Sequence, residues 1–430
     1  MKSALRTILI FLLTWEARLA LIRHKPHVIA ITGSIGKTSA KDAIYAVVAA
    51  HRRAAKSQKS YNSDIGVPLA ILGLDNPWSD PVRWVVTLAK GLLVLCQRNY
   101  PEWLVLEVGA DRPNDIRNIA RWLLPQYVVF TGVPAIPSHI EYFTSAEHVF
   151  REKRSLIEYL RPGGKVFVNA DDMRAEELKS SFRFAFVSYG FSETADFRAA
   201  HEEIEFHEAQ PIGMRFRLER EGASIPVVLH GTLGRPRIYA ALAAIAIAET
   251  LGIDAVSASH ALSAWEPAPG RMRLIPGING SLIIDDTYNA SPAAMLAALD
   301  TLGAIKNRSR KIAMLGDMLE LGKESKEAHR AAGERAAKIV SLLITVGFRA
   351  RAIGEAALDN GLRDEKIREY EQGEALRAAL ELRPEIKKND IILIKGSQGM
   401  RMEFAVRELM AHPEDAKKLL VRQDDAWQMR

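Results

Sequence analysis

A glycine-containing loop with the sequence TGSIGKTS, at residues 32–39, is the part of this chain most suited to binding phosphate. It follows the apolar run 28–31 and precedes a helical pattern at 40–48, which is the strand–loop–helix context of a phosphate loop. Its glycines allow a tight turn that directs N–H groups inward. Lys37 would reach the β- and γ-phosphates, and Thr38 would place its hydroxyl on Mg²⁺. The candidate nucleotide-binding residues of the loop are Gly33, Ser34, Gly36, Lys37, Thr38 and Ser39.

The strict phosphate-loop pattern has a glycine where this chain has Ile31. The alternative is therefore an ordinary turn between a strand and a helix, with Lys37 in solvent. The flanking strand and helix patterns favour nucleotide binding, because the helix N-terminus adds N–H donors and a positive dipole end.

Length and composition indicate a globular protein of two or three domains. The 430 residues are 48% hydrophobic and 26% charged, which is ordinary for such proteins. The net charge of +6 suits anionic substrates, and without basic–aromatic interleaving we expect no nucleic-acid partner. Cys96 is the single cysteine, which excludes an internal disulfide and a cysteine metal cluster and fits a cytoplasmic location.

Residues 1–26 differ from the rest of the chain. An apolar run at 8–13 follows Lys2 and Arg6, and it is too short to span a bilayer, which needs roughly 20 apolar residues. No small-residue cleavage site of a signal peptide precedes the phosphate loop. We predict an amphipathic helix that ends at Pro26 and packs on the body, with peripheral contact at the inner membrane surface as the competing interpretation.

Short β-branched runs alternate with helical patterns, which predicts an α/β protein with mostly parallel sheets. Residues 195–231 instead alternate polar and apolar side chains, as a small antiparallel patch does, and an alanine-rich helix follows at 238–251. A proline- and glycine-containing linker at 266–270 predicts a domain boundary. The strands are expected at 28–31, 103–106, 127–130, 165–168, 281–284, 311–314, 342–346 and 391–394. The predicted divisions are an N-terminal helix at 1–26, a central domain at 27–268 and a C-terminal domain at 269–430.

Polar residues follow several of these strands, at the edge of a parallel sheet where ligands bind. Glu107 directly follows 103–106, and beside a phosphate loop it is a natural Mg²⁺ ligand or water-orienting group, although an acid in this position is often merely exposed. His139 and Glu141 follow the next strand, where a metal or substrate role and a structural role stay open. Lys153 reads as a surface lysine.

The second half repeats this pattern. Asp285 and Asp286, Asp317, and Lys395 each lie at or just beyond the end of an expected strand. Together they predict one crevice that faces the phosphate loop across the linker. The alternative for each is a helix cap, since Asp favours such positions.

Nine segments in one order resemble those of the Mur ligases, over about residues 26–409. They are TGSIGKTS at 32–39, YNSDIGVPLAIL at 61–72, LEVGA at 106–110, SHIEYF at 138–143, VNADD at 168–172, PGRM at 269–272, IDDTYNASPAAM at 284–295, LGDMLELG at 315–322 and IKGSQGMRME at 394–403. The resemblance implies a central P-loop ATPase domain followed by a Rossmann-like ligase domain. Among the Mur ligases, the sequence most resembles those that add D-Ala-D-Ala to a UDP-MurNAc-tripeptide acceptor.

The resemblance also implies a mechanism, in which ATP phosphorylates a peptide carboxylate and an amine attacks the acyl phosphate. Lys37 would neutralise the phosphates, and Thr38 and Glu107 would hold Mg²⁺. His139 would bind a second Mg²⁺ that bridges the carboxylate and the γ-phosphate. Lys153 matches a lysine that is carbamoylated in several Mur ligases.

Residues of the C-terminal domain complete this implied site. Arg271 resembles an arginine that reaches the ATP phosphates when the domains close. Asp286 and Asn289 would face the nucleotide, with Asp286 at the ribose. We expect a monomer.

Three features depart from the family pattern. Family members usually have a separate domain for the UDP-sugar before the phosphate loop, whereas this sequence has the apolar, basic segment 1–26 in that place. UDP recognition is therefore expected to differ. The segment 234–240 lacks the asparagine that helps to seat adenine, and Glu152 precedes Lys153 in place of alanine. The alternatives are a Mur-fold ligase for another acceptor, either folylpolyglutamate-like or another cell-envelope peptide, and a non-catalytic nucleotide-binding subunit.

Overall fold

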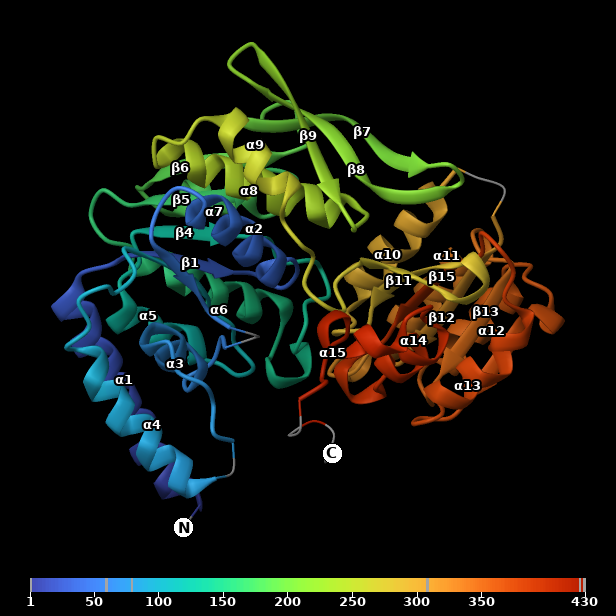
Figure 1. Ribbon diagram of the computed structural model, residues 1–430, viewed down its shortest axis with the longest axis horizontal. Helices are drawn as coiled ribbons and strands as arrows, with labels where there is room; N and C mark the ends of the chain where they lie inside the picture. The colour runs from blue at the N-terminus through green and yellow to red at the C-terminus, as the bar shows by residue number, and fades with distance from the viewer. Residues whose placement is uncertain (1, 59–60, 79, 307–308, 425–426, 428–430) are drawn as a thin grey trace.

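The structure is a computed structural model that describes residues 2–58, 61–78, 80–306, 309–424 and 427, so Met1 and 428–430 of the predicted terminal divisions lie outside it. The chain forms two lobes that lie side by side, each built around its own β-sheet (Figure 1). Within the described residues, both sheets are mostly parallel and are flanked by helices. The predicted α/β class is therefore confirmed.

The sheet of the first lobe continues from parallel strands into an antiparallel extension. Its order is β2-β3-β1-β4-β5-β6-β7-β8-β9, with parallel pairing from β2 to β7 and antiparallel pairing from β7 to β9. The alternation at 195–231 thus correctly predicted antiparallel strands, but these strands extend the main sheet and are no separate patch. The bounds are β1 His27–Thr32, β2 Ala54–Lys56, β3 Trp103–Glu107, β4 Tyr127–Phe130, β5 Lys165–Asn169, β6 Ala185–Gly190, β7 Phe197–His207, β8 Gln210–Arg220 and β9 Ala223–His230.

Strand β1 shows why its sequence is continuously apolar. Ile29 and Ile31 pack into the cluster that contains α2 and α8, whereas Val28 and Ala30 pack into the cluster on the opposite face. A parallel strand covered on both faces needs apolar side chains at every position. The helices of this lobe are α2 Lys37–Ala49, α3 Gly66–Leu72, α5 Asp115–Leu123, α6 Ala146–Glu158, α7 Ala175–Ser181, α8 Arg235–Thr250 and α9 Ala255–Ser263.

The N-terminal segment folds as one long helix, α1 (Lys2–His24), which packs against α3 and α4 (Pro81–Val94). Its buried face carries Leu13, Ala17 and Ala20. None of the helices in the described part of the chain combines the length and the apolarity needed to cross a bilayer.

The second lobe contains a sheet of order β10-β11-β15-β12-β13-β14, in which the β10–β11 pair is antiparallel and the other pairs are parallel. Its strands are β10 Arg273–Pro276, β11 Leu282–Asp286, β12 Lys311–Gly316, β13 Leu342–Val346, β14 Ile367–Tyr370 and β15 Ile391–Lys395. Its helices are α10 Pro292–Ala304, α11 Ser325–Ala337, α12 Arg351–Asp359, α13 Ala375–Leu382, α14 Glu403–Leu409 and α15 Ala416–Leu419. Residues just beyond the carboxyl end of β1 and at the carboxyl ends of β11 and β15 meet between the lobes, where they line one pocket.

Candidate active site

The phosphate loop turns directly from β1 into α2. Gly33 and Gly36 have φ values of 140° and 81°, a region that side chains other than hydrogen rarely adopt. A Cβ on Gly33 would lie 2.1 Å from Thr131 Oγ1, so the close approach also requires glycine there. Helix α2 begins at Lys37, three residues before the predicted start, and this brings Lys37 and Thr38 into its first turn.

Lys37 folds back over the loop, and its Nζ donates to the carbonyl oxygen of Gly33 at 3.0 Å. Burial lowers the pKa of Lys37, because it disfavours the charged form, and the charge of Glu107 opposes that effect. The lysine is therefore half-buried at the site and less solvated than an ordinary turn lysine would be.

Thr38 and Glu107 are joined in one buried hydrogen-bond network. Thr38 Oγ1 donates to Glu107 Oε2 at 2.9 Å, and Asn62 Nδ2 donates to Oε1 at 3.0 Å. Burial alone would raise the pKa of Glu107, but neighbouring positive charges, first among them Lys37, bring it below its ordinary value. Glu107 is therefore a carboxylate at neutral pH. Asn62 belongs to the YNSDIGVPL segment but was not predicted as a site residue.

The pair of Thr38 and Glu107 suits a magnesium ion, since a hydroxyl and a carboxylate oxygen lie 2.9 Å apart. Over the described residues, the structure contains no group of three His, Cys, Asp or Glu side chains placed to hold one metal. A magnesium ion here would take its other ligands from nucleotide phosphates and water, as Mg²⁺ does at many phosphate-transfer sites.

His139 connects the two lobes. Its Nδ1 lies 2.6 Å from Oε2 of Glu320, and its Nε2 lies 3.8 Å from Oδ1 of Asp111. The hydrogen bond from His139 lowers the pKa of Glu320. His139 is thus placed beside carboxylates and not in the Thr38 network, and neither carboxylate was singled out from the sequence. Glu141 approaches Glu320 through its backbone N–H, which donates to the Glu320 carbonyl at 3.4 Å.

The interpretation of Lys153 as a surface lysine is wrong, because only 2% of the residue is exposed. Burial lowers the pKa of Lys153 to about 7, and the charge of Lys37 adds to this effect. The charges of Glu107 and Asp111 also act on it, so Lys153 lies within electrostatic reach of the phosphate loop. The preceding Glu152 accepts backbone N–H bonds from the start of α5 and serves as its cap.

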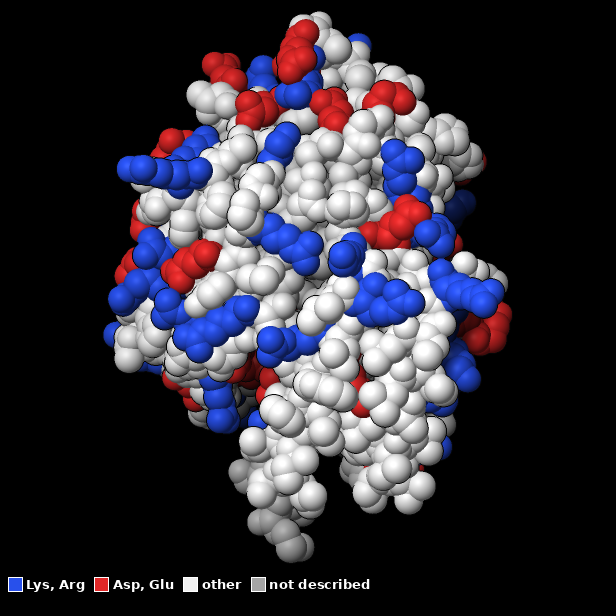
Figure 2. Space-filling view, turned by 90° about the vertical axis from the view of Figure 1, so that its left-hand side faces the viewer, with Lys and Arg blue, Asp and Glu red and all other residues white. Residues whose placement is uncertain are grey.

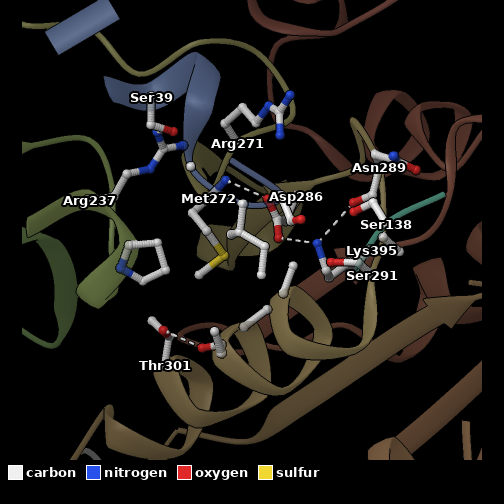
Figure 3. A pocket seen from close by; sticks show the side chains of 18 residues that line it. Ser39, Ser138, Arg237, Arg271, Met272, Asp286, Asn289, Ser291, Thr301 and Lys395 are labelled. Atoms are coloured by element: carbon white, nitrogen blue, oxygen red, sulfur yellow. Dashed lines mark hydrogen bonds and ion pairs between the residues drawn. The ribbon is translucent and has the colours of Figure 1, made fainter. Parts of the chain in front are cut away.

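A pocket of about 690 Å³, including its open mouth, lies between the lobes (Figure 3). The phosphate loop forms one wall, and the β11–α10 connection with Lys395 forms another. Arg271 crosses from the C-terminal lobe, and its Nη2 donates to Thr38 Oγ1 at 3.1 Å. Among the described residues, Arg271 Nε and Ser34 Oγ are buried polar atoms without a hydrogen-bond partner. Such atoms at a pocket rich in cations fit an anionic ligand.

Asp286 and Asn289 line this pocket, where Lys395 links them. Lys395 Nζ lies 2.5 Å from Asp286 Oδ2 and donates to the Asn289 carbonyl at 3.0 Å. The predicted crevice is therefore only partly right. Asp285 is fully buried and accepts from the backbone of Gly270 and from Thr287, and Asp317 accepts from the N–H of Ala350, so these two aspartates hold turns together.

Arg237 is a further pocket residue that the sequence did not predict. It comes from α8, is 2% exposed, and its Nη1 donates to Ser39 Oγ at 2.6 Å. Burial lowers the pKa of Arg237 to about 10, which leaves it charged at neutral pH. The signal in the sequence was the unusual segment 234–240, which lacks the asparagine expected to help seat adenine.

A second hollow of about 990 Å³ adjoins the other side of the phosphate loop, at the carboxyl ends of β4, β5 and β6. It is lined by Asn169 and Asp171 of the VNADD segment and by Tyr239 of α8. Tyr239 donates to Asp171 Oδ2 at 2.9 Å. The rest of the wall includes Ala240, Val133 and Pro134, so this hollow combines a few polar groups with an apolar lining.

Comparison with protein-family models gives two matches, which together span most of the chain. Residues 31–248 match the Mur ligase middle domain, and residues 270–398 match the Mur ligase glutamate ligase domain.

Individual relatives agree with these matches. The chain is 28% identical to the UDP-N-acetylmuramoyl-tripeptide–D-alanyl-D-alanine ligase of Bacillus subtilis, over 90% of this chain and 76% of that protein. It is 29% identical to the ligase of the same name from Escherichia coli, over 89% of this chain and 76% of that protein. Among solved structures, MurF of Thermotoga maritima in complex with ADP matches 95% of this chain and 84% of its own, with a TM-score of 0.76 at 24% identity. The structure of folylpolyglutamate synthase of Mycobacterium tuberculosis matches 92% of this chain and 94% of its own, with a TM-score of 0.64 at 15% identity.

Proposed function

The chain belongs to the Mur ligase family, and we propose that it is an ATP-dependent ligase that joins D-Ala-D-Ala to a UDP-MurNAc-tripeptide acceptor in peptidoglycan precursor synthesis. The γ-phosphoryl group of ATP passes to the acceptor carboxylate, which gives ADP and an acyl phosphate. The dipeptide amine then attacks the acyl carbon, phosphate leaves, and the amide bond forms.

One observation carries this proposal. Arg271 of the C-terminal lobe contacts Thr38 of the phosphate loop, which in turn contacts Glu107. The site is thus composed of both lobes, as a ligase that closes over ATP requires. Lys37 and Arg271 would neutralise the phosphates from two directions during transfer. Mg²⁺ held beside Thr38 and Glu107 would supply further positive charge to the phosphate oxygens.

The two hollows divide the nucleotide between them in this proposal. The ribose and phosphates would lie along the pocket that Asp286, Asn289 and Arg237 line. The adenine would enter the hollow beside Asn169 and Tyr239, because that hollow adjoins the same loop and has an apolar lining. Tyr239 would then replace an asparagine-based contact with the base. The domain division proposed for this arrangement is 27–268 and 269–430.

Carbamoylation of Lys153 is part of the proposal and has a physical basis in the site. An amine reacts with CO₂ only in its neutral form, and burial keeps the pKa of Lys153 at about 7. A carbamate would carry a negative charge, so the repulsion from Lys37 would become an attraction. It would also offer oxygen ligands near His139 and Asp111 to a second metal ion.

The experiment that tests the proposal is phosphate release by the purified protein with ATP, Mg²⁺ and UDP-MurNAc-tripeptide, with and without D-Ala-D-Ala, and with mass spectrometry of the product. We expect release that requires both substrates, and loss of turnover in Lys37→Ala. Release with glutamate and a folate acceptor, but not with D-Ala-D-Ala, would instead favour the folylpolyglutamate-like alternative. Unchanged function of Lys37→Ala would identify a non-catalytic nucleotide-binding subunit.

We further propose that the ligase acts as a monomer in the cytoplasm, with peripheral membrane contact through residues 1–26. The relatives named above support the ligase reaction and do not bear on this contact. Its physical basis lies in the apolar and basic side chains that α1 exposes.

A further inference from the structure

Helix α1 is apolar on the face that it turns to solvent as well as on the face that it buries. Ile8, Phe11, Trp15 and Ile22 are 56%, 68%, 48% and 66% exposed. Their spacings of three, four and seven residues place them on one stripe of the helix. A helix that serves only to cover the body would carry polar residues there.

Helix α4 repeats this arrangement. It exposes one apolar stripe, and it buries Thr87, Gly91 and Val94 on the opposite side. The stripe consists of Val82, Val85, Val86, Leu92 and Leu93, which are 72%, 69%, 48%, 46% and 67% exposed. Residue spacings of three, four, seven and eleven again keep these side chains on one face.

The two helices lie side by side and point the same way. His24 near the end of α1 contacts the carbonyl of Val94 at the end of α4 at 2.9 Å, and Glu16 of α1 lies against Gly91 of α4. In Figure 1 the N-terminal ends of both helices extend away from the sheet of the first lobe. The pair is thus a protruding element with apolar outer surfaces, here called the α1–α4 arm.

The charges of the α1–α4 arm are of one sign on its surface. Arg6, Arg18, Arg83 and Lys90 are exposed, whereas Glu16 is the only acidic residue within either helix and is 4% exposed. The acids at its margin, Asp64 and Asp80, are paired with Arg6 and Arg83 respectively. Figure 2 looks onto this side of the molecule, where Lys and Arg side chains gather above a lower end that is almost free of charge.

We propose that the α1–α4 arm docks on an anionic membrane surface, with its apolar stripes in the interfacial layer and its cations on the lipid headgroups. Helices of this kind bury their apolar face about 5–10 Å into the headgroup and acyl boundary. Trp15 and the basic side chains are the residue types that prefer this depth. Contiguous exposed apolar surface of this extent marks an interaction site.

The inference extends the membrane contact proposed for residues 1–26 by giving α4 an equal part in it, and it does not depend on the ligase reaction. A membrane fits the arm better than a protein partner does. The arm protrudes and offers convex apolar stripes with flanking cations. A surface that binds a protein partner would also carry polar groups that hydrogen-bond to the partner and fix its position.

Sedimentation with phosphatidylcholine vesicles, with and without phosphatidylglycerol, tests the inference. The double variant Phe11→Ser/Val85→Asp removes one exposed side chain from each stripe. The matched control is Phe348→Ser/Val256→Asp, whose side chains are 71% and 63% exposed elsewhere on the surface. We expect at least tenfold weaker binding to the phosphatidylglycerol vesicles for the arm variant, wild-type binding for the control, and weaker binding of every form as salt increases.

Two results would overturn the inference. One is equal vesicle binding by the arm variant and wild type. The other is a wild-type dimer in gel filtration that becomes monomeric in the arm variant and never binds vesicles, which would mean that a second copy of the chain covers the arm. Phosphate release is also measured for the arm variant and wild type in the absence of vesicles. This measurement reports on the proposed ligase reaction alone, so a failure of that reaction is distinguished from a failure of membrane docking.

Discussion

Titration of Lys153 tests the electrostatics of the site most directly. Burial lowers its pKa from 10.5 to about 7. At pH 7 about half of the Lys153 amines would then be neutral, whereas an ordinary lysine would have roughly one neutral amine in three thousand. The pool of amine able to react with CO₂ is therefore larger by roughly a thousandfold.

The assay is ¹³C NMR of the protein equilibrated with ¹³C-labelled CO₂ at constant dissolved CO₂ over a series of pH values. We expect a carbamate signal that rises with a midpoint near pH 7, because the neutral amine appears as pH passes the pKa. The variant Lys153→Arg should lose the signal, because a guanidinium does not form the carbamate. The control Lys90→Arg, which removes an exposed lysine of α4, should keep it.

Two outcomes would refute this reasoning. A signal that persists in Lys153→Arg would come from another amine. A midpoint near pH 10 would mean that water or a counter-charge relieves the burial of Lys153, and the physical basis for carbamoylation at neutral pH would then be lost.

Three further predictions concern other parts of the molecule. Replacement of Arg271 by Ala should lower kcat for phosphate release by about 10²–10³, the usual cost of removing a donor that stabilises transition-state charge, and Arg271→Lys should recover part of it; an unchanged kcat would exclude this role. Replacement of Glu320 by Gln should weaken its contact with His139 by about 0.5–1 kcal/mol, because both side chains are partly exposed, and small-angle scattering should then report a larger mean radius of gyration than for wild type. The third prediction concerns the stability of the variant Glu16→Gln. Burial raises the pKa of Glu16 from 4.5 to about 7, so between these pH values the native state binds more protons than the unfolded state. The free energy of unfolding of the wild type therefore falls as pH rises across that window. The variant should lack this fall and gain up to about 3 kcal/mol in urea unfolding at pH 8; equal pH profiles would mean that the Glu16 carboxyl is hydrated.

Local features of this protein could be predicted from its sequence because short-range forces determine them. The phosphate loop is such a feature, since two glycines between an apolar run and a helical pattern allow the tight strand-to-helix turn that a phosphate loop needs. The strands at 28–31 and 391–394 were predicted because strands covered on both faces must be apolar throughout. Glu107 could be predicted as a site residue because it directly follows such a strand.

The contacts that complete the site arise from tertiary packing. Arg271 meets Thr38 across 233 positions of sequence, and Arg237 meets Ser39 across 198. No local pattern encodes such a pairing, because it depends on how two lobes and a crossing helix pack. The same holds for His139 and Glu320, whose roles are set by the approach of one loop to another.

Burial is the physical reason for the largest difference between what the sequence predicts and what the folded structure shows. The sequence predicted that Lys153 is a surface lysine, yet the folded chain encloses it and lowers its pKa. On α1 and α4 the opposite occurs, because apolar stripes that would suit a core remain on the surface. The order of amino acids supplies these side chains, and their packing in three dimensions sets which of them lose contact with water.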